Sequence, residues 1–210
     1  MSGSRSTGET GRLSAGSDGV NWAEDIRALL FDRRVVLLSR RLDAETTNRA
    51  AAELMTLDAL GDEPIELQID CAEGELEAAL SLMDVIDLVG VPVHATARGL
   101  VGGPAVGVLA VSTHRRATQH ASFRLYEPKA SFRGNAGDLA QWADHSLERS
   151  RLFCHRLAAA VHRPAEHVEA DVAAGRFLSA EEALAYGLID EISGARRGEG
   201  PARPIGFAPR

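Results

Sequence analysis

Histidine and cysteine, the side chains that most often bind metals, are spread thinly along this 210-residue chain. His155 and His162 are seven residues apart, and His162 and His167 are five apart. Neither spacing matches the i, i+4 pair of a helical zinc motif, and no Cys-x-x-Cys pair occurs. The sequence therefore predicts no metal site and no bound cofactor. Surface or core roles are expected for all seven histidines, which are His94, His114, His120, His145, His155, His162 and His167.

The two cysteines, Cys71 and Cys154, indicate thiols in a reducing compartment, because a chain of this length needs no disulfide to stabilise its core. The glycine-rich segment Gly99–Pro104 lacks the Gly-x-Gly-x-x-Gly pattern and every other phosphate-binding motif. Nucleotide binding by this chain is therefore not expected.

Composition excludes several function classes. Apolar residues make up 45% and charged residues 25% of the chain, and the formal net charge is −7, which argues against a nucleic-acid scaffold. Basic pairs such as Arg115-Arg116 are scattered and indicate solvated surface. No segment has the length and apolarity of a signal peptide core or a membrane span, so we expect a cytoplasmic protein.

The ends of the chain differ from its middle. Residues 1–20 are rich in Ser, Gly and Thr, and residues 194–210 in Gly, Pro and Arg, so both have little apolar surface to bury. We expect a disordered N-terminal tail over 1–20, one folded domain over 21–193, and a flexible C-terminal tail over 194–210.

Inside that domain, short β-branched or aliphatic runs alternate with longer amphipathic ones. This alternation predicts an α/β fold around a largely parallel sheet. Strands are expected at 35–38, 65–69, 91–95 and 122–125, and helices at 43–57, 74–88, 104–111 and 136–161. Pro164 is expected to open one further helix, and a Ser-x-x-Glu capping box at Ser179 the last one.

Four segments in the right order resemble the family of the Clp protease proteolytic subunit, ClpP. They are residues 30–38, 69–74, 123–128 and the closing run 175–192, Gly-Arg-Phe-Leu-Ser-Ala-Glu-Glu-Ala-Leu-Ala-Tyr-Gly-Leu-Ile-Asp-Glu-Ile. The resemblance spans about 21–193. It implies the ClpP/crotonase fold, with repeated ββα-type units and a protruding handle helix at about 136–161.

The family uses a Ser-His-Asp triad, and the resemblance aligns other residues with its three positions. Gly103 stands at the nucleophile position, Tyr126 at the histidine position and Gly175 at the aspartate position. A phenol has an ordinary pKa near 10 and is a poor general base at neutral pH. Asp171, four residues before Gly175, is not expected to substitute for the missing aspartate.

The family's oxyanion positions also differ in this chain. One donor is the backbone N–H that follows the nucleophile, and here that residue is Pro104, which has no N–H. The other comes from a Gly-Gly turn, which reads Glu73-Gly74. We therefore expect a catalytically inactive, non-enzymatic homologue, a pseudoprotease without peptidase activity of its own.

As a consequence, the resemblance implies a structural or regulatory subunit. The family stacks two heptameric rings through the handle helix. We expect a homo-oligomeric tetradecamer or a hetero-oligomer with an active paralogue, with ring contacts through Leu139, Trp142, Phe153 and Leu157. Docking of an unfoldase ATPase is not expected, because residues 1–19 share no motif with the family's axial loops.

Three alternatives stay open. The segment Gly99–Gly107 could serve a crotonase-like enzyme as an oxyanion loop for acyl-CoA thioesters. Glu73 and Glu127, which the resemblance places near the pocket mouth, could act as acid and base, although exposed or ion-paired glutamates are the simpler interpretation. Cys71 could act as a nucleophile if a base lowered its pKa, against the simpler role of a small core residue.

Overall fold

The computed structural model describes residues 22–128 and 134–194. The predicted tails at 1–20 and 194–210 lie outside the described residues, except for Gly194. Seven helices and eight strands are present in the described part. They are α1 Trp22–Phe31, β1 Val35–Leu42, α2 Ala44–Leu60, β2 Ile65–Gly74, α3 Leu76–Leu88, β3 Val93–Ala97, β4 Leu100–Gly102, α4 Pro104–Ala110, β5 His114–Thr118, β6 Ser122–Arg124, α5 Ala136–Ala160, α6 Ala165–Ala174, β7 Phe177–Ser179, α7 Ala180–Tyr186 and β8 Glu191–Ser193.

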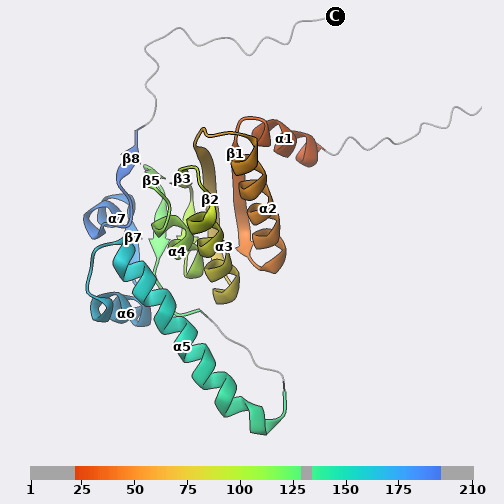
Figure 1. The fold of residues 1–210 in the computed structure, drawn as a ribbon. Helices are drawn as coiled ribbons and strands as arrows, with labels where there is room; N and C mark the ends of the chain where they lie inside the picture. The colour runs from red at the N-terminus through yellow and green to blue at the C-terminus, as the bar shows by residue number, and fades with distance from the viewer. Residues whose placement is uncertain (1–21, 129–133, 195–210) are drawn as a thin grey trace, which may run out of the picture.

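The main sheet has five strands, all parallel, in the order β1-β2-β3-β5-β8. A second sheet of three short strands, β4-β6-β7, pairs β4 with β6 in parallel and β6 with β7 in antiparallel fashion. Helices cover the main sheet, and α5 projects away from it as a long arm (Figure 1). The predicted α/β class, with a largely parallel sheet and a protruding helix, is confirmed.

The core explains why these segments fold as they do. Alternate strand residues such as Leu67 and Ile69 are fully buried, as the period of a strand requires. Helix α4 is buried along its whole length. Added side-chain atoms at Gly107 would collide with the ring of Phe153, so the base of α5 packs directly against the α4 backbone.

Several element boundaries differ from the sequence predictions. Strand β1 continues to Leu42 and β2 to Gly74, so the ends of both strands reach the region where Glu73 lies. Residues 30–31 end helix α1 instead of entering a strand. Strand β5, His-Arg-Arg-Ala-Thr, was not predicted because its polar side chains hide the alternation on which the prediction depends.

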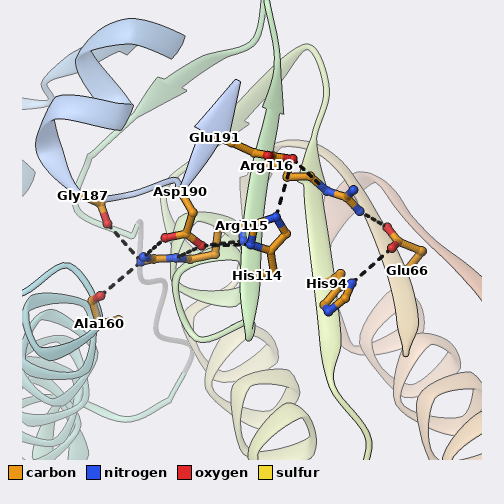
Figure 2. Close-up of polar contacts among 9 residues, drawn as sticks. All are labelled: Glu66, His94, His114, Arg115, Arg116, Ala160, Gly187, Asp190 and Glu191. Atoms are coloured by element: carbon orange, nitrogen blue, oxygen red, sulfur yellow. Dashed lines mark hydrogen bonds and ion pairs between the residues drawn. The ribbon is translucent and has the colours of Figure 1, made fainter. Parts of the chain in front are cut away.

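Arg115 of β5 joins four elements (Figure 2). Its guanidinium donates to both carboxylate oxygens of Asp190, at 3.1 and 2.5 Å, and to the carbonyls of Ala160 and Gly187 at 3.1 and 3.0 Å. Its side chain is only 13% exposed. The prediction that this basic pair is solvated surface is therefore wrong for Arg115, which connects the end of α5 to β5, α7 and β8.

The next residue, Arg116, belongs to a polar row across the sheet (Figure 2). It donates to Glu66 at 2.5 Å, and Glu66 also lies 3.4 Å from the ring nitrogen of His94. Register pairs Glu66 with His94 and His94 with His114, whose rings meet edge to face at 5.6 Å. These contacts hold the first residues of β2, β3 and β5 in line.

Candidate functional site

Gly103 occupies a tight corner between β4 and α4. It is the N-cap residue of α4, with φ 52° and ψ −125°, and its N–H donates to the carbonyl of Arg124 at 2.8 Å. An added Cβ at this position would lie 2.6 Å from Cζ of Tyr126. Glycine is therefore required at position 103 for two reasons, the positive φ and the close approach of the Tyr126 ring.

Tyr126 follows β6 and covers this corner. Its hydroxyl donates to the carbonyl of Ala72 at 3.3 Å. Burial raises the pKa of the phenol, and the nearby charge of Glu73 raises it further. Tyr126 therefore remains neutral at neutral pH, where it acts as a hydrogen-bond donor. The structure thus brings positions 103 and 126, paired by the sequence analysis, into direct contact.

Gly175 lies on the other side of Arg124. It caps the C-terminus of α6 with a left-handed backbone, φ 67°. An added Cβ there would lie 3.9 Å from Nη2 of Arg124, with open space otherwise. Between β6 and β7, the N–H of Leu125 donates to the carbonyl of Arg176 at 2.8 Å. The Arg124 side chain therefore borders both position 126 and position 175.

Arg124 and Tyr126 line a cleft of about 230 Å³, whereas Gly103 and Gly175 are not among its lining residues. Its lining comes from the ends of β1 and β2, from β4 and β6, and from the start of β7. The lining residues are Arg41, Ala72, Glu73, Gly74, Leu100, Arg124, Tyr126 and Phe177. Two arginines and one glutamate therefore supply its formal charges.

Two of the three expected oxyanion positions line this cleft, namely Glu73 and Gly74. Pro104 is buried at the first position of α4 and offers no N–H. The polar groups of the cleft are thus a neutral phenol, backbone groups of β2 and the charges of Glu73, Arg41 and Arg124.

The two glutamates named as acid–base candidates are separated. Glu73 lines the cleft, but its side chain is 73% exposed and lies 4.0 Å from the Arg41 guanidinium. Glu127 instead lines two other cavities, which run along helix α5. The structure therefore does not bring them together as an acid–base pair.

Asp171 and the cysteines take structural positions. Asp171 accepts hydrogen bonds from the Tyr186 hydroxyl at 2.9 Å and from Arg176 at 3.0 Å. Both carboxylate oxygens therefore already have hydrogen-bond donors within the fold. Burial raises the pKa of Cys71 to about 12 and that of Cys154 to about 11. Both thiols are protonated at neutral pH, which favours the core role over the nucleophilic one for Cys71.

The predicted ring-contact residues divide into two pairs. Phe153 and Leu157 are both 1% exposed and belong to the core of their own chain, so their assignment to ring contacts is corrected. Leu139 is 50% exposed. Trp142 borders a cavity between α5 and the start of α3. Leu139 is thus exposed and Trp142 half-buried, and their role in contacts with another subunit stays a prediction.

The sequence analysis did not single out five residues of the cleft lining, which are Arg41, Ala72, Leu100, Arg124 and Phe177. Arg41 faces it because the register between β1 and β2 shifts between Arg40 and Arg41, and a bulge of this kind re-aims side chains. Nothing in the sequence marks that shift. Arg124 carried a usable signal, since it is two residues before Tyr126 and thus on the same side of an extended strand.

Across residues 22–128 and 134–194, no group of three or more His, Cys, Asp or Glu side chains is placed to hold a metal ion. Within these same segments, none of the helices combines the length and apolarity needed to cross a membrane.

Comparison with known proteins gives consistent matches. The Clp protease family matches residues 18–196. ATP-dependent Clp protease proteolytic subunit 2 of Thermobifida fusca (strain YX) is 31% identical over 166 residues, which cover 78% of this chain and 82% of that protein. The protein of the same name from Nocardia farcinica (strain IFM 10152) is 26% identical over 189 residues, covering 88% and 92%.

These matches correct one expectation and decide between two others. Both relatives are named proteolytic subunits, so the expectation that the chain is not an enzyme is contradicted. They also favour the protease resemblance over the crotonase-like alternative. With most of its length matched, this chain belongs to the Clp protease family.

Proposed function

We propose that this chain is a subunit of an oligomeric Clp-type protease, in which it has a structural or regulatory role. The observation that carries the proposal is the projecting helix α5, together with the family match along residues 18–196 (Figure 1). We further propose that the complex is cytoplasmic and hydrolyses peptides, as the names of the relatives suggest.

Helix α5 has two halves with different environments. Its C-terminal half is anchored to α3 by ion pairs of Arg149 with Glu77 at 2.8 Å and of Arg156 with Asp84 at 2.6 Å. Its N-terminal half carries exposed apolar side chains, among them Leu139 and Leu147. Apolar side chains on a projecting arm support a role in association with another subunit.

The proposed assembly is a pair of heptameric rings joined through α5. It contains either copies of this chain alone or this chain together with a paralogue that carries the catalytic serine. Leu139 and Trp142 are the proposed contacts between rings.

Native mass spectrometry on the tagged chain, purified from its own host, tests the assembly, with peptide hydrolysis measured on the same sample. Leu139→Arg introduces a charge on the projecting half of α5 and is expected to shift the mass to single rings or smaller species. Leu60→Arg is the matched control, because Leu60 is 69% exposed at the end of α2 on the head.

An unchanged mass for Leu139→Arg would remove α5 from the proposed interface. A monomeric wild-type chain that co-purifies with no Clp subunit would overturn the proposed function itself.

A further inference from the structure

Arg124 is a cation without a counter-charge. Its guanidinium carbon lies 5.1 Å from the ring centre of Tyr126 and 4.9 Å from that of Phe177. Over residues 22–128 and 134–194, the Arg124 guanidinium makes no hydrogen bond or ion pair with a carboxylate or carbonyl. Two aromatic faces thus hold the guanidinium at the cleft while its N–H groups stay available.

The opposite wall carries a second arginine that is only partly neutralised. Arg41 lies 3.3 Å from Glu75 and 4.0 Å from Glu73, and its side chain is 56% exposed. Neither glutamate forms an ion pair with Arg124, although the charge of Glu73 also acts on Tyr126. The lining residues therefore carry a net positive charge in a chain whose formal net charge is −7.

The remaining lining suits a peptide. The Tyr126 hydroxyl, which donates to the Ala72 carbonyl, can still accept a hydrogen bond from a ligand, and Leu100 and Phe177 provide apolar surface. A guanidinium donates two parallel N–H bonds to a carboxylate, and stacking on aromatic rings pre-orients it for that geometry. A neutral ligand would leave the N–H donors of Arg124 unpaired. An ammonium group would be repelled by the positive charge of Arg124.

We propose that this cleft binds a peptide through a carboxylate group that pairs with Arg124. The carboxylate is supplied by the C-terminus of the peptide or by an acidic side chain, next to an apolar residue that contacts Leu100 and Phe177. This inference goes beyond the subunit role proposed above, because the cleft lies within one chain and binding does not depend on the composition of the ring.

Position 175 offers a test that leaves Arg124 in place. The left-handed backbone of Gly175 tolerates Asn and Asp better than other side chains, and its Cβ direction points toward Nη2 of Arg124. Gly175→Asp would supply the missing counter-charge and compete with the ligand. Gly175→Asn has the same shape without the charge and is the matched control.

Ligand-observed NMR on the purified full-length chain measures the affinity of four acetylated tetrapeptides. Ala-Ala-Leu-Ala is used with a free C-terminal carboxylate and as its amide. Ala-Asp-Leu-Ala amide and Ala-Asn-Leu-Ala amide test the side chain. We expect each carboxylate peptide to bind about ten- to a hundredfold more tightly than its neutral partner. The larger of the two differences identifies the source of the carboxylate.

Gly175→Asp is expected to remove this preference and Gly175→Asn to keep it. Arg124→Gln is expected to remove it as well, whereas Arg49→Gln, at an exposed arginine of α2, keeps it. Equal affinity for carboxylate and amide peptides, no measurable binding, or equal effects of the two Gly175 variants would overturn the inference. Because assembly is measured separately by native mass, such a result leaves the proposed subunit role standing.

Discussion

Two arginines close together in the sequence have opposite environments. Arg115 of β5 is largely shielded from solvent, and Asp190 and two backbone carbonyls accept hydrogen bonds from its guanidinium (Figure 2). Arg124 lies at the cleft, where only the rings of Tyr126 and Phe177 contact its guanidinium among the described residues. One cation is neutralised within the fold, and the other remains available to a ligand.

The difference shows that residue type does not decide the role of an arginine in this fold. A buried guanidinium is stable only when its donors and charge are satisfied, so Arg115 is expected to contribute to folding stability. An exposed guanidinium stacked on two rings costs little to leave unpaired, because water and a ligand can both reach it. Arg124 is therefore expected to contribute to binding and little to stability.

Replacement of Arg115 should have the largest effect on stability. Arg115→Gln removes the guanidinium from the carbonyls of Ala160 and Gly187 and leaves the Asp190 carboxylate only the backbone N–H of residue 115 as a donor. We expect a loss of about 3 kcal/mol in the free energy of unfolding. Urea denaturation followed by circular dichroism measures it. A loss no larger than that of Arg49→Gln, at an exposed arginine, would remove the contrast between the two sites.

A side chain at Gly103 should have the next largest effect. Gly103→Ala places a Cβ against the Tyr126 ring at a positive φ, and we expect a loss of about 2 kcal/mol. In a Tyr126→Ala background the steric part of this cost disappears, so a double-mutant cycle should show coupling. Gly137→Ala, in the first turn of α5, is the control and should be neutral or stabilising. Additive effects of the Gly103 and Tyr126 changes would show that the two positions do not touch.

The Arg115 site should also respond to acid. Hydrogen bonds from Arg115 lower the pKa of Asp190 below its ordinary value of 3.8. The ionised carboxylate thus favours the folded state above that value, and its contribution is lost as the pH falls through the lower, folded-state pKa. Asp190→Asn should flatten the acid side of the stability curve between about pH 5 and 2.

Thermal unfolding across this pH range measures that change. Asp62→Asn, at an exposed aspartate before β2, is the control. In an Arg115→Gln background the Asp190→Asn substitution should have a smaller effect on the pH dependence of stability. An undiminished effect in that background would show that Asp190 does not act through Arg115.

Replacement of Arg124 should have the smallest effect on stability. Arg124→Gln removes two stacking contacts at an exposed site and should change the free energy of unfolding by no more than about 1 kcal/mol. The same urea denaturation measures it. A loss as large as that of Arg115→Gln would make Arg124 a structural residue and break the comparison.

The alternation of apolar and polar runs was sufficient to predict the α/β class and most elements. Asp43 and Ser179 both cap helices through capping boxes, and Pro164 precedes α6, because these signals act over a few residues. Strands β4, β5, β7 and β8 were not predicted, because each is short or polar and is defined by its pairing within a sheet and not by an apolar pattern.

The sequence by itself was sufficient to show the family, and it predicts that Gly103, Tyr126 and Gly175 stand at the family's catalytic positions, since both inferences depend only on residue order. Only the tertiary structure decided what surrounds them. The β1 bulge brings Arg41 to the cleft, and the pairing of β6 with β7 brings Arg124 between Tyr126 and Phe177. These contacts join residues that are far apart in the chain. The charges around the cleft therefore depend on strand register and on the distances between side chains, which no local sequence pattern encodes.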